Sequence, residues 1–150
     1  MPAEENSDEV GIPVLLRFAR NTFISAIQQA QAQAGCEDMP RNGTYVIGSI
    51  ARVGSPLSQI IKELGVSKQA AGQLVDTLVA RGYLDRTPDP EDRRRLTITL
   101  TERGRHAAEA SQAAVAKVEA DLLAEVGPEC VANTRATLWA LIDAGGEHRR

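Results

Sequence analysis

The sequence has few aromatic residues and few of the side chains that build metal sites. Of its 150 residues only 3% are aromatic, and it contains two cysteines and two histidines. Strands favour aromatic and β-branched residues, so this composition argues against a β-sandwich and favours close-packed helices. Cys36 and Cys130 have no CxxC spacing, and His106 and His148 stand apart from other ligand types. We therefore expect no disulfide framework, no metal centre and no cofactor.

The sequence also lacks a long hydrophobic run. No apolar stretch approaches the roughly 18 residues that a membrane-spanning helix requires, and Arg17 and Arg20 interrupt the most apolar N-terminal segment. The first nine residues are acidic and lack the positive start of a signal peptide. We expect a cytoplasmic protein with no membrane partner. No nucleophile–base pair is recognisable, so we do not expect an enzyme.

The overall charge is at first sight wrong for a nucleic-acid binder. There are 17 basic and 20 acidic side chains, which give a net charge of −3. The charges are unevenly distributed, however, because residues 57–106 hold 9 Lys and Arg against 7 Asp and Glu. This region is net basic, and the rest of the chain is strongly acidic. The net charge is therefore an average over a basic region and an acidic remainder, and it does not exclude a nucleic-acid binder.

The first predicted helix runs from Ile12 to about Ala34. Pro13 suits its first turn and Gly35 suits its end. Apolar side chains surround much of its circumference, so one covering surface is not enough to bury them. A second subunit is a plausible source of the missing surface.

Three short helices are predicted next, over residues 45–53, 57–64 and 67–80. Only Gly65 and Val66 separate the last two, and Ser67 is a favourable N-cap for the third. Two short helices joined by so tight a turn form a helix-turn-helix. The third helix has an apolar stripe that includes Ala70 and Leu74, and its other face is polar.

The hydrophobic period then changes from helical to alternating. Residues 83–87 are predicted to form a strand, and residues 88–92 have turn composition. Residues 94–100 alternate, with Leu96, Ile98 and Leu100 inward. A β-hairpin directly behind a helix-turn-helix makes a winged helix. Two further helices are predicted over residues 102–126 and 129–144, on either side of Gly127-Pro128.

The run from Leu57 to Gly104 resembles the MarR family of bacterial transcription regulators. The resemblance is most specific in the wing, where the motifs are Gly82-Tyr83-Leu84-x-Arg86, Asp92-x-Arg94 and Leu100-Thr101-x-x-Gly104. The flanking predicted helices match the family in their order, so the resemblance extends from about Ile12 to Ala144.

The predicted elements and the resemblance together indicate a fold class that is mostly α with a small β-hairpin wing. It consists of a winged helix-turn-helix joined to a helical dimerisation layer. The resemblance implies one domain over residues 12–144, in which 12–35 and 102–144 dimerise and 45–101 bind DNA. An acidic disordered tail over 1–11 and a C-terminal tail over 145–150 flank it. The implied protein is a homodimeric, ligand-responsive repressor on a pseudo-palindromic DNA operator. Its small-molecule effector, for which an aromatic compound is one candidate, has no identified residues.

In a helix-turn-helix, the first turns of the second helix enter the major groove. This places Lys68, Gln69, Gly72 and Gln73 at base edges or adjacent phosphates, where Gln pairs with adenine and Lys donates to guanine or phosphate. Ser67 caps the helix and contacts a phosphate. Gly72 either permits close approach of the helix to DNA or has no function. In the second case it only lowers the stability of the helix, by about 1 kcal/mol relative to alanine. An ordinary solvated helix face is the alternative, and the wing behind the helix argues against it.

The wing tip carries the sharpest DNA-binding signal. We expect Arg94 to enter a minor groove, whose concentrated negative potential attracts a guanidinium group. Asp92 would orient Arg94 by a paired hydrogen bond, while Arg86 and Arg93 would contact phosphates or support the hairpin. A solvated charge run is the alternative for these residues. At the level of function, the alternative is a winged-helix protein-interaction module that does not bind DNA.

Three other residues invite functional hypotheses that the sequence does not favour. Redox sensing at Cys36 is not expected, because reactive thiols need nearby positive charge, whereas Cys36 follows a helix C-terminus and precedes two acids. Cys130 is predicted to be packed as a small hydrophobe. Trp139 is predicted to lie in the core or in a dimer interface and not in a ligand pocket.

Overall fold

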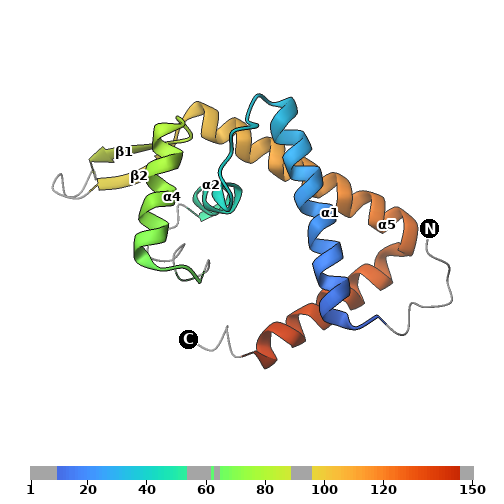
Figure 1. Ribbon diagram of the computed structural model, residues 1–150. Helices are drawn as coiled ribbons and strands as arrows, with labels where there is room; N and C mark the ends of the chain where they lie inside the picture. Colours follow the sequence, from blue (N-terminus) through green and yellow to red (C-terminus); the bar gives the residue numbers. More distant parts are fainter. Residues whose placement is uncertain (1–9, 54–61, 63–64, 89–95, 146–150) are drawn as a thin grey trace. The chain divides into compact units, whose positions relative to one another are not determined.

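A computed structural model describes most of the chain, shown in Figure 1. The described residues are 10–53, 62, 65–88 and 96–145. By their internal contacts they fall into two compact units, residues 1–114 and 115–150. Some predicted features lie outside the described residues: the helix over 57–64 apart from Lys62, the wing-tip residues Asp92, Arg93 and Arg94, and most of both tails.

Helix α1 spans Ile12–Gln33, which confirms the predicted first helix. Pro13 lies in its first turn, where a missing N–H costs nothing. Gly35 follows its end with φ +71°, a backbone conformation that favours glycine. The side chains from residue 10 to residue 22 are all exposed, so the N-terminal half of α1 lies outside the core of unit 1.

Helices α2 and α4 span Gly43–Val53 and Lys68–Ala80. The hydroxyl of Ser67 accepts a hydrogen bond of 3.1 Å from the backbone N–H of Ala70, which confirms the predicted N-cap of α4. The buried residues of α4 are Ala71, Val75 and Leu78. Ala70 is exposed, so its predicted place on the buried stripe was wrong.

The hairpin consists of strands β1, Leu84–Pro88, and β2, Leu96–Leu100, paired antiparallel. Its register pairs Leu84 with Leu100 and Pro88 with Leu96. Ile98 and Leu100 pack against the core, as their alternation predicts. The sequence thus predicted the wing's position behind α4 and the inward face of β2 correctly.

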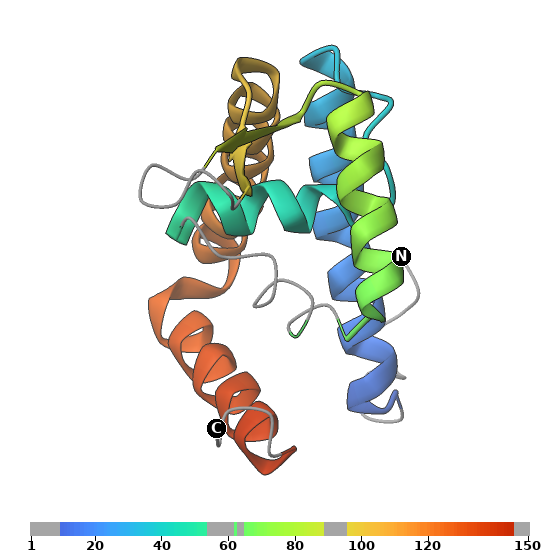
Figure 2. The same cartoon turned by 90° about the vertical axis from the view of Figure 1, so that its left-hand side faces the viewer.

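The core of unit 1 is built from α2, α4, the start of β1, the first turns of α5 and the loop after α1. In Figure 1 α2 lies between α1 and α4, and in Figure 2 it runs across them. The core residues are Cys36, Val46, Ile47, Val75, Leu78, Tyr83, Leu84, Ala107 and Ala108. Because Tyr83 and Leu84 belong to this cluster, the start of the wing is anchored in the same core that supports α4.

Helix α5 spans Glu102–Ala144, and the boundary between the two units falls within it. Gly127 has non-helical angles, φ 80° and ψ 166°, and Pro128 follows it, so the predicted break at this position is confirmed. Cys130 is exposed in unit 2, so its predicted packing was wrong. Within the described residues, no helix combines the length and the hydropathy needed to cross a bilayer.

Candidate nucleic-acid interface

The first two turns of α4 bring together the five residues predicted to approach the major groove. Lys68, Gln69 and Gln73 are exposed there, and Ser67 caps the helix directly before them. Because residues three and four apart share a helix face, these side chains and Gly72 form one polar surface. Figure 1 shows α4 beside the hairpin at one side of unit 1. We call this polar surface, formed by Ser67, Lys68, Gln69, Gly72 and Gln73, the α4 face.

Gly72 is not required by packing against the residues that the structure describes. A Cβ atom built at this position would meet none of their atoms within 4 Å. The backbone is helical there, so an alanine would meet no strain from these neighbours. The described part of unit 1 therefore gives no explanation for the conformational cost of the glycine, and its close approach to DNA stays a prediction.

Arg86 on β1 forms an ion pair with Asp76 on α4. The exposed pair ties the first wing strand to α4, although such pairs contribute at most about 1 kcal/mol to stability. It also compensates the acidic charge that Asp76 would otherwise present one turn beyond the α4 face. Sequence reasoning named Arg86 but missed its partner, because no spacing rule links a helix residue to a strand residue across a turn.

The first turn of α5 binds the backbone where α4 ends and β1 begins. The Thr101 hydroxyl donates a hydrogen bond of 2.6 Å to the carbonyl of Gly82, and the Thr101 N–H donates one of 3.1 Å to the carbonyl of Tyr83. The same hydroxyl accepts a bond of 3.0 Å from the N–H of Gly104, so it also caps α5. These contacts give a physical role to the Leu-Thr-x-x-Gly motif after the wing.

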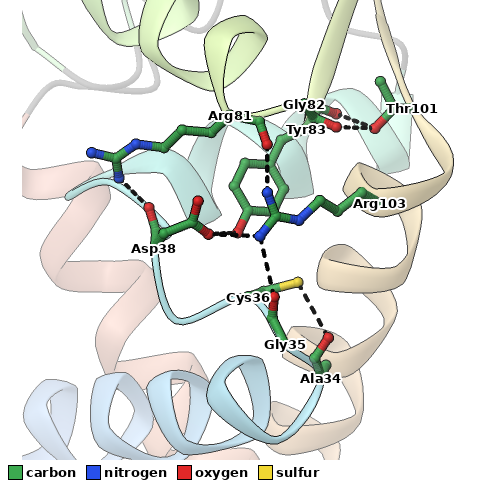
Figure 3. A network of polar contacts seen from close by, with 9 residues as sticks. All are labelled: Ala34, Gly35, Cys36, Asp38, Arg81, Gly82, Tyr83, Thr101 and Arg103. Atoms are coloured by element: carbon green, nitrogen blue, oxygen red, sulfur yellow. Dashed lines mark hydrogen bonds and ion pairs between the residues drawn. The ribbon is translucent and has the colours of Figure 1, made fainter.

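Arg103 lies at the centre of a second set of contacts, drawn in Figure 3. Its guanidinium lies over the ring of Tyr83, 4.4 Å from the ring centroid, and donates a hydrogen bond of 2.5 Å to the carbonyl of Arg81. It also donates to the carbonyl of Gly35 at 3.2 Å and to the carboxylate of Asp38 at 2.8 Å. One side chain therefore joins α5, the end of α4 and the loop after α1.

Asp38 completes this set of contacts from the loop between α1 and α2. Its carboxylate accepts a hydrogen bond from the Tyr83 hydroxyl, and its carbonyl accepts one from the Arg81 guanidinium. The bond from Tyr83, together with the positive charge of Arg103, lowers the pKa of Asp38. Burial and the bond to Asp38 raise the pKa of Tyr83. We call Asp38, Arg81, Tyr83 and Arg103 the junction network.

Sequence reasoning did not single out the junction network. Its ion pair joins residues 65 positions apart, which no local motif can reveal. Cys36 lies beside it, buried, with its thiol 3.6 Å from the carbonyl of Ala34.

Unit 1 also contains an open hollow of about 580 Å³ between α2, β2 and the first turns of α5. Its lining combines aliphatic side chains with hydroxyl, amide and charged groups. The lining residues are Ile50, Ala51, Thr97, Ile98, Thr99, Leu100, Arg105, Ala108, Glu109 and Gln112.

Comparison with known proteins gives a consistent result. The model of the MarR family matches residues 37–95. RV1404 from Mycobacterium tuberculosis has a similar structure, with 28% identity, a TM-score of 0.67, and coverage of 96% of this chain and 97% of that chain. A transcriptional regulator of the MarR family from Rhodococcus sp. RHA1 is 25% identical, with a TM-score of 0.62 and coverage of 93% and 97%. No curated protein sequence matches the chain.

A third structure, of S. aureus MepR bound to ethidium bromide, is 21% identical, with a TM-score of 0.60 and coverage of 92% of this chain and 99% of that chain. It shows the shared fold. The family match spans the helix-turn-helix and reaches into the wing, where the sequence motifs are most specific. Residues 37–95 therefore match the MarR family, and the chain has the winged-helix fold of a solved transcriptional regulator of that family.

Proposed function

We propose that this regulator binds double-stranded DNA as a homodimer and represses transcription from a pseudo-palindromic operator. The observation that carries the proposal is the α4 face: Lys68, Gln69 and Gln73 are exposed in the first two turns of a capped helix beside a hairpin. Glutamine and lysine side chains supply the donors and acceptors that distinguish base edges in the major groove. A protein-interaction surface would instead favour apolar or acidic groups at these positions.

The proposed dimer is formed by two copies of this chain through the helices over residues 12–35 and 102–144. Large apolar side chains are exposed on both sets of helices, and exposed apolar surfaces of this kind mark protein–protein contacts. They include Ile12, Val14, Leu15, Leu16 and Phe18 on α1, and Leu122, Leu123, Val126, Trp139, Leu141 and Ile142 on α5. A two-fold dimer would place two α4 faces on one side, as a palindromic operator requires.

The hollow in unit 1 is the proposed site for a small-molecule effector. Its lining is about half aliphatic and half polar, so it offers a compact organic ligand both apolar contact and groups that fix its orientation. MepR, which shares the fold, has been crystallised with the aromatic cation ethidium. In this chain the hollow touches β2, so a ligand there would act on the wing and change the population of DNA-binding states.

Selection of binding sites from random duplex DNA tests the proposed function. We expect the enriched sites to be palindromes with half-site centres about one helical turn, roughly 34–36 Å, apart. Affinity should fall steeply with salt, because several arginines and lysines displace counterions from the phosphates. A purified dimer that retains no duplex DNA at low salt would instead support a protein-interaction module.

Replacement of Arg94 by alanine tests the wing. We expect operator affinity to fall by about 10- to 100-fold, the range for one lost groove contact, while the protein stays dimeric by size-exclusion chromatography. Fluorescence anisotropy at fixed salt measures the change. Arg41→Ala is the control, because it removes an exposed arginine outside the basic region. Equal affinities of Arg94→Ala and the parent protein would refute the role of Arg94.

A further inference from the structure

We propose that Asp38 and Arg103 are positioning residues for operator binding: they set the direction of α4 and the hairpin without contacting DNA. This inference rests on the proposed function. It assigns a part in DNA recognition to the loop between α1 and α2, which carries none of the residues predicted to contact DNA.

The first argument is the place of these contacts in the fold. The carbonyls of Arg81, Gly82 and Tyr83 form the link between α4 and β1, and all three accept hydrogen bonds from Thr101 or Arg103. The link is thus fixed on the first turn of α5. Figure 3 shows Arg103 lying between this link and the loop that contains Asp38.

The second argument concerns how far a small tilt of α4 displaces its groove-facing end. α4 has 13 residues, so its groove-facing end lies about 20 Å from its C-terminal end at a rise of about 1.5 Å per residue. A tilt of about 5° at the junction network would move the α4 face by about 2 Å over that length. Binding groups must be held within about 0.5 Å of their productive positions. A small loosening at this network therefore affects base contacts at the far end of the helix.

The third argument separates positioning from stability. The side chains of Arg103 and Asp38 are 39% and 43% exposed, and ion pairs this exposed add little to the stability of a fold. Their geometry is nevertheless specific, because the guanidinium donates to three oxygens and lies over an aromatic ring. Such an arrangement fixes an orientation more than it holds the fold together.

The test compares operator DNA with a scrambled duplex of equal length. Asp38→Ala removes the carboxylate, and Arg103→Lys keeps the charge but loses the planar group that reaches three oxygens. We expect each variant to bind the operator about tenfold more weakly, the cost of about one mismatched base pair. Affinity for the scrambled duplex, and its salt dependence, should stay unchanged, because no phosphate contact is lost. Asp38→Asn, which keeps an acceptor for the Tyr83 hydroxyl, should recover part of the loss.

The matched control is Glu37→Ala, which removes an exposed carboxylate from the same loop, outside the junction network and outside the proposed dimer helices, and should leave both affinities unchanged. The double variant Asp38→Ala/Arg103→Lys should lose no more than the worse single variant, because both act through one network. Equal losses on operator and scrambled DNA would overturn the inference and indicate general unfolding. Unchanged operator binding in both single variants would overturn it and leave the proposed function intact. If the parent protein bound no DNA, the proposed function itself would fail.

Discussion

Gly104→Ala is expected to lower the free energy of unfolding by about 3 kcal/mol, the upper range for overpacking a closed site. A Cβ atom at position 104 would lie 2.0 Å from the carbonyl oxygen of Tyr83. It would also lie 3.2 Å from a methyl group of Leu100. No real Cβ approaches an oxygen so closely, so the backbone of either α5 or Tyr83, directly before β1, would have to move.

Neither backbone segment has room to move. The carbonyl of Tyr83 accepts the N–H of Thr101, and the side chain of Tyr83 is 0% exposed within the core. A shift of α5 would break the cap that the Thr101 hydroxyl makes with the N–H of Gly104. The substitution therefore costs packing, a strand contact and a helix cap together, and these losses are larger than a methyl group alone would cause.

Urea unfolding followed by circular dichroism measures this effect, with Gly48→Ala as the matched control. Gly48 also lies in a helix, α2, but a Cβ there would meet no atom of the described residues within 4 Å. We expect Gly48→Ala to be neutral or to stabilise the protein by up to about 1 kcal/mol, from helix propensity. If Gly104→Ala and Gly48→Ala unfolded at similar urea concentrations, the contact between α5 and Tyr83 would not constrain position 104.

The features predicted correctly from the sequence depend on local physics. Ser67 was identified as an N-cap because serine before an amphipathic run satisfies an otherwise unpaired N–H, and the structure shows that bond. Gly127 followed by proline was identified as a break because neither residue favours a helix interior. The alternation of apolar and polar residues along β2 indicated which face of the strand points inward. Each of these three signals acts over only a few residues.

The features that were missed depend on long-range geometry. Asp38 and Arg103 are too far apart in the sequence for any periodicity to connect them, and the ion pair between Asp76 and Arg86 crosses from helix to strand. Ala70 was placed on the buried stripe although it is exposed. Alanine has little preference for either environment, so the exact rotation of α4 had to come from packing.

The exposed face of α1 leads to the second large effect, which concerns assembly. If the protein is the proposed dimer, Leu15→Glu/Phe18→Glu is expected to convert it into a monomer and to lower operator affinity by about 100- to 10,000-fold, because a monomer loses the gain from binding two half-sites together. Leu15 is 49% exposed and Phe18 58% exposed, so the substitutions disturb no core packing within unit 1. Two buried, unpaired carboxylates at the interface would oppose association.

Sedimentation velocity and operator titration of the same samples measure both consequences. Gln29→Glu is the matched control, because it adds a carboxylate to the same helix at an exposed position that is already polar. Circular dichroism should show that Leu15→Glu/Phe18→Glu keeps its helix content, since the N-terminal half of α1 contributes no core residue. A folded double variant that still sediments as a dimer would show that this face of α1 is not the subunit contact. A monomer that retained full operator affinity would show instead that recognition does not need two α4 faces.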